Sequence, residues 1–333
     1  MKSVVLTKQD SPLKIEDRDS LEPSEGQVIV SLKASALNRR DYWITQGLYP
    51  GIQYPAVLGS DGAGVVSRIG ANVDESMIGL DVLINPGLNW GNNQSYQSSD
   101  FQILGMPGLG TLASEVLVPA ENVCPKPEHL SWSEAAALPL AGLTAFRALM
   151  KQGLAKTGDT VLITGIGGGV ATFAMTFALA IGMKVLVTSS SDEKLSKARS
   201  LGAAAGYNYG TDDWGKQLKS AHGMPNLIVD GAGGAGYGVL LNLASPGGTI
   251  VSYGSTAGAP GKVDLFKVFW KQLRLIGSTM GSANDFDEML DLVSRHNLRP
   301  VIDCQFEMEN ITDAFEQMAE SRQFGKIVVN QPM

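Results

Sequence analysis

The sequence is poor in the residues that build disulfide frameworks and metal clusters. Its 333 residues include two cysteines, Cys124 and Cys304, and three histidines. A single pair of distant cysteines does not indicate a disulfide framework, and so few histidines restrict both metal sites and catalytic triads. Basic side chains number 26 against 33 acidic ones, which gives a formal net charge of −7. This balance argues against a general affinity for nucleic acid or for anionic membranes.

Long apolar runs are also scarce. Residues 160–183 carry no charge and could span a bilayer, which takes about 20 residues. Glycines at 165 and 167–169 interrupt this segment, and the roughly 13 residues that follow are typical of a helix in a globular core. The opening residues MKSVVLTKQD lack the apolar core of a signal peptide. We therefore expect a cytoplasmic protein without a membrane-spanning helix.

Glycine, in contrast, is abundant. It occupies 39 positions, well above the usual share of about 7%, and it lies between apolar runs rather than in a low-complexity tract. At about 150 residues per domain, the length predicts two domains. The first third predicts a β-rich domain with a polar, irregular segment at 87–110 that is long for a connection. Its strands are expected at 27–33, 64–69, 81–84 and 113–118.

From about Ser131 the pattern changes to strands that alternate with helices. Ser131 and Glu134 have the spacing of a capping box at a helix start. The alternation that follows predicts a parallel sheet covered by helices. Its strands are expected at 161–163, 185–187, 227–229 and 249–251, and its first two helices at 170–181 and at 192–201, the latter stopped by Gly202.

Beyond Lys271 the chain resumes short strands. Helices are expected near 284–295 and 310–321, followed by a terminal strand at 326–329. We expect that last strand to return to the first domain.

The strongest local motif joins the strand at 161–163 to the next helix. Glycine fills four of five positions, Gly165, Gly167, Gly168 and Gly169, and Val170 follows. Without side chains the backbone can approach a pyrophosphate, to which the helix N-terminus offers N–H groups and partial positive charge. A tight turn without a ligand is the alternative, but four glycines exceed what a turn needs. We therefore expect a dinucleotide here.

The end of the next strand indicates which dinucleotide binds. An acidic residue about 20 residues after the glycine turn would bind the ribose 2′-hydroxyl of NAD. This strand ends instead in the hydroxyls of Ser189, Ser190 and Ser191, with Lys194 nearby, and Asp192 comes late enough to be the N-cap of the next helix. Hydroxyls and a lysine suit a 2′-phosphate, so NADPH is favoured over NADH.

Five segments in order along the chain carry a resemblance to a known family. They are 36–41 (ALNRRD), 58–66 (LGSDGAGVV), 141–145 (AGLTA), the glycine turn and 325–329 (GKIVV). The sequence resembles the medium-chain dehydrogenase/reductase superfamily and, within it, the zinc-independent quinone oxidoreductase-like branch. In the glycine turn, Gly165, Gly168 and Ala171 stand at the three key places, with alanine a slight departure at the third.

The resemblance implies an α/β fold of two domains. A GroES-like, β-rich catalytic domain is expected over 1–125 and completed by 272–333. A Rossmann domain with a doubly wound parallel sheet is expected over 126–271. The substrate cleft should lie between the domains, outside the carboxyl ends of the parallel strands.

The resemblance also bears on metal binding. The places of the catalytic zinc ligands in alcohol-oxidising relatives fall on Asn38, Ser60 and near Leu140, none of which is a good zinc ligand. Segment 87–110 contains no cysteine for a structural zinc and is interpreted as a vestige of that lobe. We therefore expect no metal.

Positions of function follow from the same resemblance. It places Asn38, Asp41 and Tyr49 in the catalytic cleft, where Tyr49 or water would supply the proton; an aromatic plug is the alternative for Tyr49. Beyond the glycine turn, Ser189, Ser190 and Lys194, the nucleotide is expected to meet Thr144, Tyr209, Gly254, Ser255 and Thr279.

Two of these positions, and two further residues that the resemblance brings near the cofactor, have a structural alternative. Thr144, expected at a helix start, could cap that helix, and Tyr209 could be an ordinary strand tyrosine. Lys326 could touch the cofactor but is favoured as a surface lysine. Asp230 could face the cofactor or cap the turn that follows it.

The sequence contains no nucleophile–base motif that would support acyl transfer. The expected cofactor site and cleft instead predict hydride transfer. A conjugated acceptor needs less Lewis-acid help than a simple ketone, since its charge spreads through the π system. We expect NADPH-dependent reduction of quinones or α,β-unsaturated carbonyl compounds; the alternatives are an enoyl-thioester reductase and a non-catalytic NADPH-binding protein. Relatives commonly pair through the edge of the nucleotide-binding sheet, and apolar residues 266–270 suit a homodimer.

Overall fold

The computed structural model describes residues 1–331, which form two compact units. The first contains Met1–Leu143 together with the C-terminal segment from Gly281, and the second is Thr144–Met280. The second unit thus begins and ends later than the expected 126–271. Helix α2 (Trp132–Ala137) explains the first difference, because it packs on strands of the first unit.

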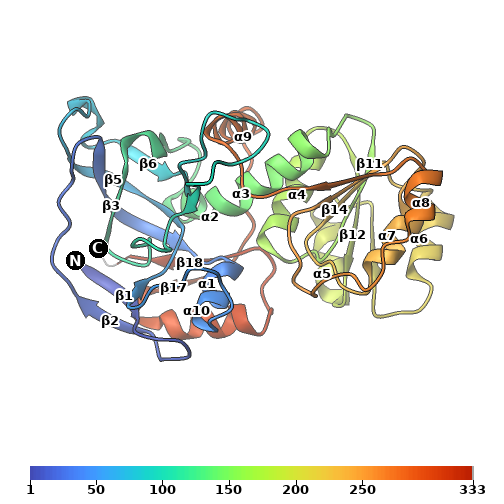
Figure 1. Cartoon of the computed structure of the whole chain (residues 1–333), viewed down its shortest axis with the longest axis horizontal. Helices are drawn as coiled ribbons and strands as arrows, with labels where there is room; N and C mark the ends of the chain where they lie inside the picture. Colours follow the sequence, from blue (N-terminus) through green and yellow to red (C-terminus); the bar gives the residue numbers. More distant parts are fainter. Residues whose placement is uncertain (332–333) are drawn as a thin grey trace. The chain divides into compact units, whose positions relative to one another are not determined.

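The first unit is built on a seven-stranded sheet (Figure 1). Strand β3 (Gln27–Ala36) pairs with β5 (Asp61–Ile69), β9 (Glu115–Pro119) and β18 (Lys326–Asn330), all antiparallel. The terminal strand therefore returns to the first domain as predicted, and in Figure 1 the red C-terminal elements lie among the blue N-terminal ones. The other members of the sheet are β6 (Asp81–Ile84), β10 (Val123–Pro125) and β17 (Ile302–Glu307).

Smaller elements complete this unit. A three-stranded sheet has the order β2-β1-β4, and four helices are α1, α2, α9 and α10. A core cluster that includes Leu37, Ile44 and Phe315 packs α1 and α10 against the strands. The bounds are β1 Lys2–Leu6, β2 Lys14–Asp17, β4 Ala56–Val57, α1 Arg39–Thr45, α9 Ala283–Arg295 and α10 Ile311–Ala319.

Segment 87–110 is irregular but anchored. Strands β7 (Gly87–Leu88) and β8 (Gln102–Ile103) form a two-stranded hairpin. Between them Trp90 is 5% exposed and meets Phe101 edge to face, with ring centroids 5.2 Å apart. Aromatic packing thus holds this loop where the resemblance suggested a vestigial metal lobe.

The second unit is a six-stranded parallel sheet of order β13-β12-β11-β14-β15-β16. This is the doubly wound order, whose reversal point lies between β11 and β14. The strands are β11 Thr160–Ile163, β12 Lys184–Ser189, β13 Ala205–Asn208, β14 Leu227–Asp230, β15 Thr249–Ser252 and β16 Arg274–Gly277. The helices are α3 Pro139–Phe146, which crosses from the first unit, and α4 Gly169–Ala180, α5 Asp192–Ser200, α6 Trp214–His222, α7 Tyr237–Leu243 and α8 Leu265–Trp270. The predicted α/β class is confirmed.

Two of the three predicted signals at helix ends are confirmed, and one is wrong. The capping box of Ser131 and Glu134 is present at the start of α2, and Gly202, with φ +112°, follows the end of α5. The expected N-cap Asp192 is wrong: the Ser191 hydroxyl accepts from the backbone N–H of Lys194, so Asp192 is the first helical residue. A serine one place earlier can cap equally well.

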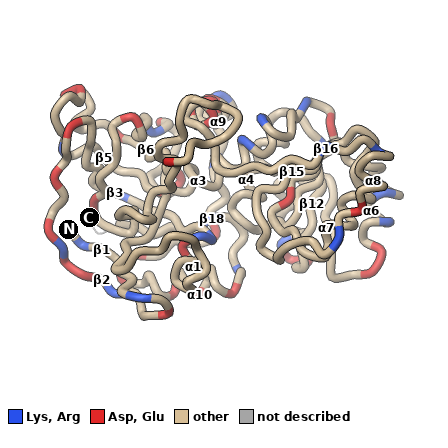
Figure 2. Tube along the Cα trace, viewed as in Figure 1, with Lys and Arg blue, Asp and Glu red and all other residues tan. Residues whose placement is uncertain are grey.

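Two features concern the whole chain, the distribution of its charged residues and the length of its apolar helices. Figure 2 shows acidic and basic residues interspersed along both units. Within residues 1–331, no helix is both long and apolar enough to cross a membrane.

Candidate active site and nucleotide-binding turn

The start of α1 organises the polar centre of the first unit. Asn38 is the N-cap, and the Asp41 carboxylate accepts hydrogen bonds from the N–H of Asn38 (2.8 Å) and of Gly59 (3.2 Å). Burial raises the pKa of Asp41, an effect that the charge of Arg40 and the Asn38 N–H oppose. Asp41 is fully buried, so its contacts are those of a residue that ties the helix start to the Gly59 turn.

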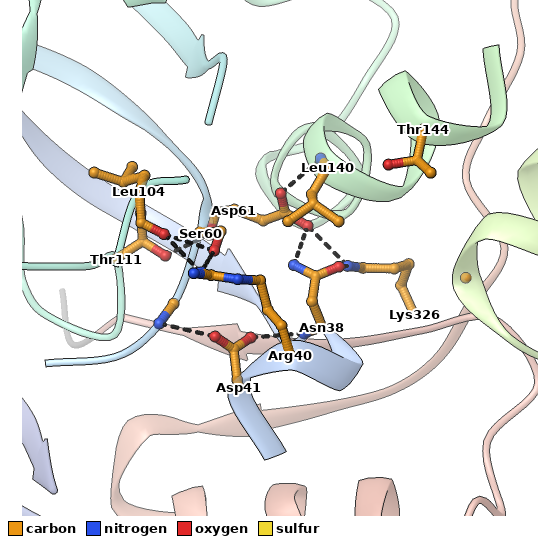
Figure 3. A network of polar contacts seen from close by, with 12 residues as sticks. Asn38, Arg40, Asp41, Ser60, Asp61, Leu104, Thr111, Leu140, Thr144 and Lys326 are labelled. Atoms are coloured by element: carbon orange, nitrogen blue, oxygen red, sulfur yellow. Dashed lines mark hydrogen bonds and ion pairs between the residues drawn. The ribbon is translucent and has the colours of Figure 1, made fainter. Parts of the chain in front are cut away.

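A buried ion pair lies beside this helix start (Figure 3). The Lys326 ammonium is 2.8 Å from Asp61 Oδ2, and the two side chains are 2% and 0% exposed. Asn38 joins both: its Oδ1 accepts from Lys326 Nζ at 2.8 Å, and its Nδ2 donates to Asp61 Oδ2 at 2.9 Å. The backbone N–H of Leu140 donates to the other Asp61 oxygen at 2.7 Å. The expectation of a surface position for Lys326 is therefore wrong, because Asp61 and Asn38 satisfy its charge inside the protein.

Arg40 supplies a second buried cation. It is 8% exposed; Nη1 donates to the Ser60 hydroxyl and, at 2.9 Å, to the carbonyl of Leu104 in the loop above. Ser60 Oγ donates to the same carbonyl at 2.7 Å. Arg40 and Ser60 together fix segment 87–110 over the site.

Tyr49 lies against Arg40. The guanidinium carbon is 4.8 Å from the tyrosine ring centroid, and Nε donates to the phenol oxygen at 3.3 Å. The ring is half-buried and packs against the apolar cluster of the first unit. The Tyr49 ring thus packs against the core while its hydroxyl contacts a cation, an arrangement that fits both a catalytic residue and an aromatic plug.

The residues at the expected zinc places do not form a zinc ligand set. The Asn38 oxygen accepts from an ammonium, the Ser60 hydroxyl is bonded to Arg40 and Leu104, and Leu140 offers only its backbone. Zinc in proteins takes thiolate, imidazole and carboxylate ligands. Nowhere in residues 1–331 do three His, Cys, Asp or Glu side chains gather as a metal site.

The two cysteines stand apart from this centre. Both are free and partly buried. Burial and the nearby Asp287 raise the pKa of Cys124 to about 12, and burial and Asp303 raise that of Cys304 to about 11. Neutral thiols of this kind are poor nucleophiles and poor metal ligands.

In the second unit the glycine turn lies between β11 and α4, at the reversal point of the sheet. Gly165 and Gly167 have φ values of +65° and +114°, which glycine adopts most easily. Gly168, the N-cap of α4, has an ordinary φ of −74°, and a Cβ built there would have no neighbour nearer than 3.8 Å. Neither backbone nor packing requires glycine at 168, so the open space above it fits a ligand that approaches the helix N-terminus.

The expected third place, Ala171, is 1% exposed and allows α4 to pack on the sheet. Asp230 caps the turn that follows it, the structural alternative given for this residue. Its carboxylate accepts from the hydroxyl of Thr164 and, at 2.9 Å, from the N–H of Gly233. It therefore caps the turn after β14 and pins that turn to the start of the glycine turn.

The predicted ribose-phosphate residues gather at the end of β12. Ser190 is exposed, whereas Ser189 is 5% exposed and its hydroxyl accepts from the N–H of Ser191 at 3.1 Å. The Asp192 carboxylate accepts from the side chain of Asn208 at 2.9 Å. Tyr209 follows β13 rather than lying in a strand, and it is 51% exposed.

The other predicted nucleotide positions lie at separate points of the second unit. Gly254 and Ser255 follow β15, and a Cβ at Gly254 would come within 2.9 Å of the Gly231 carbonyl, so two turns approach closely there. Thr279 is exposed after β16. Thr144 is buried near the end of α3, not at a helix start as expected, because α3 begins at Pro139.

Sequence reasoning missed the roles of Arg40 and Asp61. Both lie within the segments that carried the resemblance, but their partners are distant: 265 residues separate Asp61 from Lys326 and 64 separate Arg40 from Leu104. The available signal was charge in otherwise apolar surroundings, a group of three at 39–41 and the single Asp61 in 58–66.

Comparisons with known proteins agree with both units. Residues 24–128 match the alcohol dehydrogenase GroES-like domain, and residues 169–295 match the zinc-binding dehydrogenase family. A zinc-type alcohol dehydrogenase-like protein, YogA, from Leptosphaeria maculans is 37% identical over 343 residues, covering 96% of this chain and 94% of that protein. Crotonyl-CoA reductase from Streptomyces avermitilis is 30% identical over 300 residues, covering 82% of this chain and 67% of that enzyme.

The fold has close solved counterparts as well. The crystal structure of an NAD-dependent alcohol dehydrogenase superposes with a TM-score of 0.93 at 34% identity and covers 99% of both chains. Two matching domain families, relatives along nearly the whole chain and a shared fold lead to one conclusion. The chain belongs to the medium-chain dehydrogenase/reductase superfamily of oxidoreductases.

Proposed function

We propose that this chain is a zinc-independent, NADPH-dependent reductase that delivers hydride to a conjugated carbonyl compound, an α,β-unsaturated carbonyl or a quinone. The observation that carries the proposal is the Asp61–Lys326 ion pair, bridged by Asn38. In this arrangement Asn38, the residue at the first expected zinc place, accepts a hydrogen bond from the ammonium of Lys326. A divalent cation at this point would have to displace Lys326 and overcome its charge.

The proposed substrate class depends on which groups near Asn38 could stabilise the charge that develops on the substrate. Zinc activates an alcohol by lowering the pKa of the oxygen that it binds, but the Asn38 amide and the Ser60 hydroxyl are not the thiolate, imidazole or carboxylate ligands that zinc takes. A conjugated acceptor disperses the charge that develops when hydride adds to it, so hydrogen-bond donors and a nearby cation can suffice. Lys326 and Arg40 provide buried positive charge in this unit.

The glycine turn supports the nucleotide assignment. Gly165, Gly168 and the first turn of α4 would hold the pyrophosphate, and Ser190 and Lys194 would hold the 2′-phosphate that selects NADPH. When bound, the reduced nicotinamide supplies the hydride. We extend this assignment to Thr144, Tyr209, Gly254, Ser255 and Thr279 as further contacts.

A second candidate function is the reduction of an enoyl thioester. The similarity to crotonyl-CoA reductase along 82% of this chain favours it. Both functions share the same hydride acceptor, a carbon conjugated to a carbonyl, and differ in whether a thioester carrier must bind.

We also propose a homodimer formed through the second unit. Phe266, Phe269 and Trp270 of helix α8 are 59%, 63% and 72% exposed. Strand β16, which follows α8 in sequence, is an edge strand of the six-stranded sheet. Exposed aromatic residues beside an open strand edge suit pairing with a second copy.

The test measures NADPH and NADH oxidation by metal-analysed protein with quinones, enones, crotonyl-CoA and aldehydes. Reduction of enones or quinones by zinc-free protein, with NADPH preferred, is the expected result. Faster turnover of crotonyl-CoA would favour the thioester candidate. Nucleotide binding without turnover of any acceptor would favour the non-catalytic alternative, and activity that requires stoichiometric zinc would refute the proposal.

A further inference from the structure

We propose that a groove in the first unit binds a small organic ammonium ion with an aromatic body. The groove lies between helices α1 and α10, which lie side by side (Figure 1), and residues 10–13 complete its lining; its volume is about 280 Å³. The polar centre around Asn38, Asp61 and Lys326 does not line it. The inference goes beyond the proposed function, because neither a nucleotide nor a hydride acceptor enters it.

The floor of the groove is apolar and aromatic. Phe315 of α10 is 8% exposed and belongs to the core cluster of the first unit, and Leu13 and Tyr42 pack against that cluster. Ala319, the last residue of α10, also lines the groove, and its small side chain leaves space that a larger one would fill. An aromatic ring is the body that packs best on such a floor.

Hydrogen bonds hold the third wall of the groove in place. The backbone N–H of Asp10 donates to the carbonyl of Thr45, the last residue of α1, at 3.0 Å. The side chain of Gln9 donates to the carbonyl of Gln46 at 3.1 Å, and Pro12 restricts the backbone of the same segment. The groove is therefore formed before a ligand enters, and binding does not have to order this segment.

The charge of the lining is negative only. It includes the carboxylates of Asp10 and Glu316 and no lysine or arginine. Both carboxylates are exposed, and among residues 1–331 neither forms an ion pair or a side-chain hydrogen bond. Helices α1 and α10 end in the lining, at Thr45 and Ala319, and helix C-termini add partial negative charge. A cation complements this groove, and an anion does not.

The cation beside the groove does not meet this charge. The guanidinium carbon of Arg39 is 5.7 Å from the ring centroid of Tyr42. Arg39 donates to the carbonyl of Met318 at 2.6 Å and to the hydroxyl of Ser321 at 2.8 Å, and it is not part of the lining. The carboxylates of the groove thus stay available for an ammonium ion from solution.

The size of the groove selects a small molecule rather than a protein partner. Eleven residues line it, whereas a stable protein interface takes about 20–30 residues a side. Its volume of about 280 Å³ lies just below the range of about 300–1,000 Å³ for drug-sized ligands. The 2-phenylethylammonium ion has a ring for the apolar floor and an ammonium for the carboxylates, so it is the probe.

The experiment titrates 2-phenylethylammonium with the whole chain and follows the ligand signals by NMR. Wild type should bind with a Kd of about 1 mM, because so small a ligand makes few contacts. Asp10→Asn and Glu316→Gln should each weaken binding about two- to fivefold, the range of an exposed charge pair, and the double variant about tenfold. Ala319→Leu should remove this binding, because leucine fills the groove from an exposed position that suits a helix former.

Controls separate the groove from other sites and from folding. Asp313→Asn removes an exposed carboxylate of α10 that does not line the groove, so it should leave the Kd unchanged. The neutral analogue 2-phenylethanol should bind about tenfold more weakly than the ammonium, after subtraction of any binding that persists in Ala319→Leu. A thermal melt shows that Ala319→Leu is folded.

Three results would overturn the inference: no binding of the ammonium to wild type, unchanged affinity in Ala319→Leu, or equal affinity for the alcohol. None of them bears on the proposed reductase, which is tested by turnover of NADPH.

Discussion

Breaking the Asp61–Lys326 pair should destabilise the first unit strongly. Lys326→Met leaves the carboxylate with two N–H donors, from Asn38 at 2.9 Å and Leu140 at 2.7 Å, but no cation. Asp61→Asn leaves the ammonium without its counter-ion. Because the side chains are 2% and 0% exposed, water cannot replace the lost partner, and each change should cost about 3–5 kcal/mol.

The double variant is the sharper measurement. Asp61→Asn with Lys326→Met removes both charges, so no buried ion is left unpaired. It should lose no more stability than either single variant, which gives a coupling energy of at least about 3 kcal/mol between the two sites.

Tryptophan placement allows unfolding of the first unit to be followed by itself. Trp43, Trp90 and Trp132 lie in the first unit, and Trp214 and Trp270 in the second. In a Trp214→Phe/Trp270→Phe background, fluorescence during urea unfolding reports on the first unit. With m values of about 1–3 kcal/mol per molar urea, the loss of about 3–5 kcal/mol in the single variants should lower the midpoint by about 1–5 M.

An exposed pair serves as the control. Glu22 is 3.0 Å from Arg68, but its side chain is 81% exposed, so Glu22→Gln should cost about 0–1 kcal/mol. If Lys326→Met and Asp61→Asn cost no more than Glu22→Gln, or if their effects simply add, the reasoning from burial is refuted.

Four further predictions test other parts of the molecule. Gly168→Ala should leave thermal stability unchanged, because φ and space permit a Cβ, yet weaken NADPH binding about tenfold or more, about 1.4 kcal/mol, measured by fluorescence titration; equal affinity would contradict the role of the turn. With a pKa raised to about 12 by burial and a nearby carboxylate, Cys124 should react with iodoacetamide at pH 8 far more slowly than after unfolding, as mass spectrometry can follow. Burial and a neighbouring lysine lower the pKa of His222, so its contribution to stability is present above the unfolded value of about 6.5 and is lost as pH falls below it; His222→Gln should flatten the melting temperature between pH 7 and 5. Trp270→Glu should convert a dimer to a monomer in light scattering, and a monomeric wild type would refute the proposed pairing.

Local patterns in the sequence were sufficient for most of the fold. The capping box of Ser131 and Glu134, the stop at Gly202 and the strands around the glycine turn depend on neighbours a few residues away, so spacing and residue type predict them. The same holds for the glycine turn itself, whose positive φ values belong to glycine. Where two nearby residues could do one task, as with Ser191 and Asp192, the local pattern was not decisive.

Tertiary structure alone decided the polar centre of the first unit. Lys326 looks like a surface lysine in sequence, and only the return of β18 to β3 brings it to Asp61 and Asn38. Arg40 likewise finds Leu104 and Tyr49 through chain folding rather than through spacing. The physical reason is that burying a charge is favourable only when its partners are already in place, and those partners come from segments that are far apart along the chain.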